Sequence, residues 1–143
     1  MGNMRLIENH FGLVFIDDKD RVVPFPTAIK RLRKDQDLSQ PGLAKLLAVT
    51  TGTVCGWEHG SPPKPSMLLL IRRVFFSEGK YAPVEPFVFS VKAIKELRES
   101  QGLTIAKFTH LLGVSTQAYE RWMDGHSPTK YILLLIQLTF VKK

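Results

Sequence analysis

An internal repeat constrains the fold of this chain more than any other feature of its sequence. Residues 28–33, Ala-Ile-Lys-Arg-Leu-Arg, return as residues 93–98, Ala-Ile-Lys-Glu-Leu-Arg, and the match continues without a gap at a constant offset of 65. Trp57 thus corresponds to Trp122, and Phe75 to Phe140. Gapless similarity over about 48 residues indicates one structural unit that is used twice. Two copies are too few for a solenoid, so we expect two small domains.

The basic charge of the chain lies on the two repeats. The 143 residues include 20 Lys or Arg and 13 Asp or Glu, which gives a net charge of +7. Residues 27–80 contribute +5 and residues 90–143 contribute +4, whereas residues 1–26 contribute −1 and Glu85 the last −1. Basic repeats predict a polyanionic partner. The alternative is a surface charge that serves solubility alone.

Several classes of protein are disfavoured by what the sequence lacks. A single cysteine, Cys55, excludes an intrachain disulfide and a cysteine-based metal site. The four histidines have no metal-ligand spacing, and no catalytic pattern stands out, so we expect neither an enzyme nor a metal or other cofactor. No export leader opens the chain, and its apolar runs are shorter than the ~18–20 residues that span a bilayer. We therefore expect a cytoplasmic protein with no membrane contact.

Capping residues and glycines divide each repeat into four expected helices. In the second repeat, a first helix follows Ser90, and the next helices run over 105–112, 116–123 and 131–140. In the first repeat, the first three helices are expected to follow Thr27, Ser39 and Thr50, and the fourth is expected to occupy residues 67–76. Apolar residues at helical spacing mark the inner face of each helix, and both tryptophans fall on such a face.

The middle of each repeat has two short helices that are joined by a tight turn. The residues that carry this pattern in the second repeat are Leu103-Thr104, Leu111-Leu112-Gly113-Val114-Ser115, Tyr119, Trp122, Gly125 and Pro128, followed by a leucine run. In this order they resemble the Cro/C1-type (XRE) helix-turn-helix family, including its antitoxin-type regulators. The resemblance covers both repeats, about two thirds of the chain. In the first repeat Ala48 replaces Gly and Thr50 replaces Ser, and Gly52 and Gly56 weaken the third helix by ~1 kcal/mol each relative to Ala.

The resemblance implies that the third helix of each repeat enters the major groove of DNA. In the second repeat its outward positions are Thr116, Gln117, Glu120 and Arg121. Gln117 is suited to adenine and Arg121 to guanine, because each side chain can form two hydrogen bonds with that base. The alternative is a set of solvated side chains on a surface helix.

In the first repeat the same outward positions hold short residues, which cannot form long bidentate contacts. Thr51 and Thr53 remain as candidates for contact with a thymine methyl group or a phosphate. The second repeat is therefore expected to specify sequence and the first mostly to contact the DNA backbone. The expected phosphate contacts are Gln40, Lys45, Lys64, Ser115, Lys107 and Lys130, and further candidate cations are Lys30, Arg31, Lys34 and Lys92.

The segments outside the repeats contain short strand patterns. Residues 11–16 and 21–25 are apolar and flank the polar tetrad 17–20, which predicts a β-hairpin. Residues 86–89 predict a further strand, which we expect to pair with the hairpin and to join the repeats as a pseudo-twofold unit. The alternative is a flexible linker over 77–86 with independent domains.

The sequence therefore predicts a mainly α protein with a small antiparallel β element and two tandem Cro/C1-like helix-turn-helix domains. The expected division is an N-terminal hairpin segment (1–26), a first repeat (27–76), a linker with a short strand (77–89) and a second repeat (90–143). The leading function is sequence-specific binding of double-stranded DNA, most simply by a transcriptional regulator that occupies its site as a monomer with an internal pseudo-dimer or as a homodimer. Alternatives are an accessory factor of plasmid transfer, recombination or partition, an antitoxin that binds its toxin through residues 1–26, and a protein-interaction scaffold.

Overall fold

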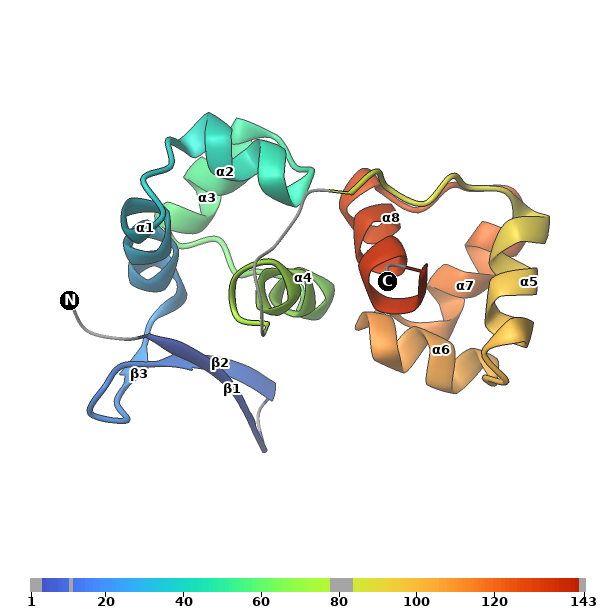
Figure 1. The fold of residues 1–143 in the computed structure, drawn as a ribbon, viewed down its shortest axis with the longest axis horizontal. Coiled ribbons are helices and arrows are strands. Elements are labelled where there is room, and N and C mark those ends of the chain that lie inside the picture. Colours follow the sequence, from blue (N-terminus) through green and yellow to red (C-terminus); the bar gives the residue numbers. More distant parts are fainter. Residues whose placement is uncertain (1–3, 11, 78–83, 142–143) are drawn as a thin grey trace. The chain divides into compact units, whose positions relative to one another are not determined.

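The computed structural model describes residues 4–10, 12–77 and 84–141 (Figure 1). Within these residues the chain is mainly helical, with eight α-helices and one small antiparallel sheet, as the sequence predicts. It divides into two compact units, Met1–Tyr81 and Ala82–Lys143. Among the described residues, no helix is long and apolar enough to cross a membrane.

The two units contain the same succession of four helices. In the first unit they are α1 (Phe25–Asp35), α2 (Gln40–Leu47), α3 (Thr51–Glu58) and α4 (Pro65–Phe75). In the second they are α5 (Val91–Ser100), α6 (Ile105–Leu112), α7 (Thr116–Met123) and α8 (Lys130–Ile136). The predicted bounds of α6 and α7 are confirmed.

Three helix ends differ from the prediction. The first helix begins at Phe25 with Pro24 as its cap, rather than after Thr27, and α4 begins at Pro65 rather than at residue 67. A proline in the first turn explains both differences, because its missing N–H would have no intrahelical partner there. The last expected helix, 131–140, is α-helical only to Ile136 and continues as a π-helical segment, Gln137–Val141.

Side-chain caps fix the starts of the other helices. Five capping oxygens each accept a hydrogen bond, 3.0–3.2 Å long, from the backbone N–H three residues further on. These caps, all predicted from the sequence, belong to Ser39, Thr50, Ser90, Thr104 and Ser115. A Ser or Thr cap stabilises a helix by ~1 kcal/mol, so the sequence sets these starts locally.

One position distinguishes the turns that lead into α3 and α7. Ala48 and Gly113 both adopt left-handed backbone conformations, with φ of 57° and 66°. This conformation costs an L-residue about 1 kcal/mol but is open to glycine. Ala48→Gly is therefore expected to raise the free energy of unfolding by up to ~1 kcal/mol, and Gly113→Ala to lower it by a similar amount. Urea denaturation of the two variants checks this pair, and a loss of stability in Ala48→Gly would contradict it.

Each unit has its own apolar core, and both tryptophans belong to these cores as predicted, with 5% of each exposed. In the first unit the ring of Trp57 contacts Phe25 edge-on, with ring centroids 5.8 Å apart. In the second unit the fully buried Phe108 stacks on Phe140 at 4.8 Å. The π-helical segment thus closes the core beneath α6.

The sheet consists of N-terminal strands only. Its order is β1 (Arg5–Asn9), β2 (Gly12–Ile16) and β3 (Val22–Val23), and all pairs are antiparallel. The predicted hairpin corresponds to β2 and β3, where Phe15 pairs with Val23. The first strand was not predicted. Phe15 holds the sheet against the helices of the first unit through ring contacts with Phe25 at 6.0 Å and Phe76 at 5.9 Å.

The prediction that residues 86–89 pair with the hairpin was wrong. These residues form no strand, and the Phe87 N–H donates to the Leu133 carbonyl in α8 at 3.1 Å. The backbone of this segment thus forms a hydrogen bond within the second unit. The third strand of the sheet, next to the predicted hairpin, is β1 instead. Part of the linker that was expected over 77–89 lies outside the described residues.

Candidate nucleic-acid interface

The turns that join α2 to α3 and α6 to α7 have the same geometry. Each spans three residues, 48–50 and 113–115, and begins with a left-handed residue. In each, the N–H of the following valine returns to a helix carbonyl at 3.0 Å, from Val49 to Ala44 and from Val114 to Thr109. These bonds satisfy the free carbonyls at the helix end. The first turns of α3 and α7 consequently begin at equivalent, exposed positions.

The exposed face of α7 contains all four base readers that were predicted in the second repeat. Thr116, Gln117, Glu120 and Arg121 are exposed, whereas the opposite face is held in the core through Tyr119 and Trp122. Gln117 and Arg121 are four residues apart, which places them one turn apart on the same side of the helix. Within the described residues, neither side chain has a hydrogen bond or an ion pair. They are therefore available to a ligand.

The outward face of α3 carries much shorter side chains. Thr51, Gly52 and Thr53 are exposed, and Cys55 is half-buried. The Thr53 hydroxyl lies 2.9 Å from the Thr50 hydroxyl, so it takes part in the cap of its own helix. Of the two predicted readers in this repeat, Thr51 is the less engaged.

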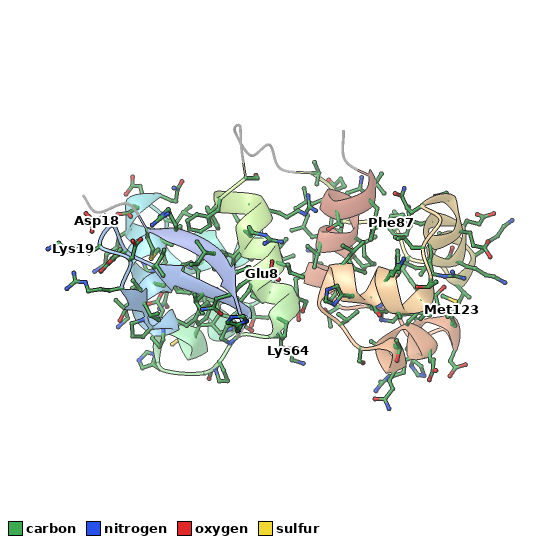
Figure 2. The ribbon with its side chains drawn as sticks, turned by 90° about the horizontal axis from the view of Figure 1, so that it is seen from below. Glu8, Asp18, Lys19, Lys64, Phe87 and Met123 are labelled. Carbon is green, nitrogen blue, oxygen red and sulfur yellow. The ribbon has the colours of Figure 1, made fainter. Side chains whose placement is uncertain are left out.

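The predicted phosphate contacts all reach solvent. The lysines lie near the ends of helices: Lys64, labelled in Figure 2, directly precedes α4, and Lys130 is the first residue of α8. Lys45, Lys107 and Ser115 are exposed as well, and Gln40 is half-buried. The Ser115 oxygen accepts the Ala118 N–H at 3.1 Å, and this bond does not use its hydroxyl hydrogen. The lysine charges and this hydroxyl therefore remain accessible.

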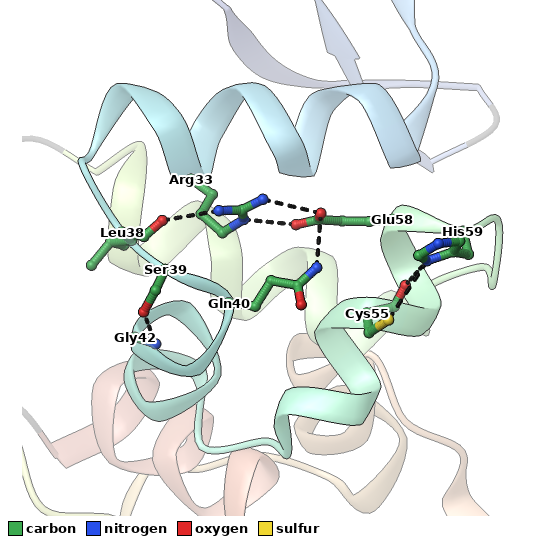
Figure 3. A network of polar contacts seen from close by, with 8 residues as sticks. All are labelled: Arg33, Leu38, Ser39, Gln40, Gly42, Cys55, Glu58 and His59. Atoms are coloured by element: carbon green, nitrogen blue, oxygen red, sulfur yellow. Dashed lines mark hydrogen bonds and ion pairs between the residues drawn. The ribbon is translucent and has the colours of Figure 1, made fainter.

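Sequence reasoning missed a part-buried ion pair between α1 and α3, to which Gln40 connects α2 (Figure 3). The guanidinium of Arg33 meets the Glu58 carboxylate at 2.8 Å and 3.2 Å, and also donates to the Leu38 carbonyl at 3.2 Å. Glu58 is only 6% exposed. The hydrogen bonds from Arg33, followed by that from Gln40, hold the pKa of Glu58 below its ordinary value against the opposing effect of burial. The same pair raises the pKa of Arg33.

This network also involves Gln40, a predicted phosphate contact. Its amide nitrogen donates to Glu58 at 3.1 Å, which fastens the start of α2 to the end of α3. This bond uses one of the two hydrogens of the amide nitrogen, so it does not exclude a phosphate contact through the other. The structure shows Gln40 as a brace between the two helices, and its contact with a phosphate stays a prediction.

The second unit keeps the arginine but replaces the carboxylate. Arg98 occupies the position of Arg33, and it donates to the Leu103 carbonyl at 2.7 Å, just as Arg33 donates to Leu38. Met123 stands where the first unit has Glu58, and the Tyr119 hydroxyl accepts from Arg98 at 2.9 Å instead. The repeated arginine in the first matching hexapeptide was the sequence signal for this network.

The described residues contain no group of three or more His, Cys, Asp or Glu side chains that could hold a metal ion. No protein-family model, curated protein or solved structure matches the chain.

Proposed function

We propose that this protein binds double-stranded DNA in a sequence-specific manner, through the exposed first turn of α3 and the exposed face of the first two turns of α7. The observation that carries the proposal is the exposed face of α7, on which Gln117 and Arg121 lie one turn apart. We further propose that its two units are tandem helix-turn-helix domains and that it regulates transcription by occupying its site.

Elementary geometry supports the insertion of α7 into DNA. The major groove of B-DNA admits one α-helix, and the N-terminal turn of that helix reaches the base edges. The free N–H groups and partial positive charge at the same turn favour nearby phosphates. Glutamine and arginine are the side chains that pair with adenine and guanine through two hydrogen bonds each.

The contrast between α3 and α7 supports a division of labour between the units. The exposed residues at the start of α3 are Thr51, Gly52 and Thr53, and none has a long polar side chain. We infer that α7 specifies the sequence, whereas α3 contacts mainly the backbone of the duplex. The net charges of the repeats, +5 and +4, favour both contacts.

The dependence of binding on salt tests this function against that of a protein-interaction scaffold. If Lys45, Lys64, Lys107 and Lys130 each neutralise one phosphate, log K is expected to fall with log salt with a slope of about −3.6. Replacing any one of these lysines by glutamine is expected to reduce the slope by about 0.9. Fluorescence anisotropy on a labelled duplex at several salt concentrations measures this slope, and Lys95→Gln serves as the control. Duplex binding that does not depend on salt, or no duplex binding, would contradict the proposal.

A further inference from the structure

A basic hollow of about 690 Å³ lies between the turn that joins β2 to β3 and the helix α1. Its wall includes Lys19 and Arg21 from the turn and Lys30, Arg31 and Lys34 from α1. Figure 2 labels Lys19 and its neighbour Asp18 at the tip of this turn. Cations from two separate elements thus surround one space, away from the first turn of α3.

The carboxylates in the wall offset only part of this charge. Asp17 accepts hydrogen bonds from the N–H groups of Arg21 and Lys19, at 3.0 Å and 2.9 Å, and from the Arg21 guanidinium at 3.0 Å. These bonds, that from the Arg21 N–H first, lower the pKa of Asp17, which keeps it ionised and fixes the turn. With Asp17 and Arg21 paired, four cations face Asp18 and Asp35, which leaves a charge of +2 in the wall.

The cations on α1 are not required by the fold. Lys30, Arg31 and Lys34 correspond in α5 to Lys95, Glu96 and Glu99, so the second unit forms the same helix with one cation and two acids. Lys30 and Lys34 are four residues apart and repel each other by a few tenths of a kcal/mol. Within the described residues, no carboxylate lies within 4.0 Å of either ammonium group. A bound anion would relieve this repulsion.

We propose that this hollow binds a cluster of phosphate groups. Lysine and arginine head groups present several N–H donors each, and an ionised phosphate accepts such bonds strongly. The phosphates belong either to the backbone of a duplex or to a free phosphorylated small molecule. The site stands on the charges of the hollow and not on Gln117 or Arg121, so it can fail or hold independently of the proposed reading of bases.

Titration of the full chain with sodium tripolyphosphate, followed by amide NMR at 0.15 M salt, tests the site. We expect saturable shifts in residues 17–21 and 27–35, with affinity about tenfold lower in the triple variant Lys30→Gln/Arg31→Gln/Lys34→Gln. The matched change in the second unit, Lys95→Gln, is expected to leave the affinity unchanged. Asp35→Asn is expected to raise the affinity for tripolyphosphate about threefold, because it removes a negative charge that repels the phosphate groups. Shifts spread over the lysines of both units, or weaker binding by Asp35→Asn, would overturn the proposal.

A second comparison distinguishes the two sources of phosphate. If the hollow takes the DNA backbone, the triple variant is expected to bind a duplex extended by about ten base pairs on each side more weakly, while its affinity for a minimal duplex stays unchanged. If the hollow takes a free molecule, the triple variant is expected to lose tripolyphosphate binding and to keep its affinity for both duplexes.

Discussion

Replacing Gln117 and Arg121 together by alanine is expected to remove about 2–6 kcal/mol of discrimination between the target duplex and an unrelated one, since each bidentate base contact contributes ~1–3 kcal/mol. Both side chains are exposed and lie on the same side of α7. The change should thus weaken binding to the target selectively and leave the salt-dependent affinity for unrelated duplexes nearly intact. Competition binding with the two duplexes measures the ratio of affinities.

The start of α3 supplies the control in the first unit, where Gly52 corresponds to Gln117 and the preceding residue, Thr51, has a side chain that can be removed. Thr51→Ala alters the start of α3 as Gln117→Ala alters that of α7, but it removes only a short side chain. We expect a small loss of affinity with little change in discrimination. A larger loss of specificity from Thr51→Ala than from Gln117→Ala would reverse the assignment of the units. Thermal unfolding of both variants is expected to stay close to wild type, because exposed substitutions of this kind change stability by about 0.5 kcal/mol or less.

Replacing Glu58 by glutamine is expected to lower the free energy of unfolding of the first unit by ~1–3 kcal/mol. The Glu58 side chain is 3% exposed and that of Arg33 is 18% exposed, so the change leaves a largely buried guanidinium without its counter-charge. Removing one partner of a fully buried pair costs ~3–5 kcal/mol. We expect a smaller loss here, because the pair is part-buried and the glutamine oxygen can still accept from Arg33. Hydrogen exchange of the α1 and α3 amides measures the effect within the first unit.

The same carboxylate predicts a dependence of stability on pH. The folded state holds the pKa of Glu58 below its ordinary value of 4.5. Its contribution is therefore fully present above about pH 4.5 and is lost as the pH falls through the lowered folded pKa. Glu58→Gln should remove this part of the acid sensitivity. The exchange of α7 amides in the second unit, where Met123 takes this place, serves as the control. Equal acid sensitivity of wild type and variant in α3 would contradict the role given to Glu58.

The sequence predicts the helices well because their ends depend on local chemistry. A capping hydroxyl oxygen lies only three residues before the N–H from which it accepts a hydrogen bond. Gly113 ends α6 because glycine readily adopts the left-handed backbone conformation that is found there. The inner and outer faces of α7 follow from the spacing of Tyr119 and Trp122. For the same reason, the helical spacing alone predicts that Gln117 is exposed.

Features that depend on distant partners could not be read from the sequence in the same way. The strand β1 is polar at both ends, and it forms because Leu6 packs inward while its backbone pairs with β2. The apolar pattern of residues 86–89 fits a strand, but the backbone of Phe87 bonds to α8 instead. Arg33 and Glu58 are 25 residues apart, and only the packing of α1 against α3 brings them together.

Selection from a pool of randomised duplexes tests the central claim most directly. The full chain is incubated with the pool at 0.15 M salt, and the bound fraction is amplified and sequenced over several rounds. We predict enrichment of one short motif, and loss of that enrichment in the Gln117→Ala/Arg121→Ala variant. A pool that stays random with the wild-type protein, or an identical motif from the double variant, would contradict the claim that α7 reads DNA.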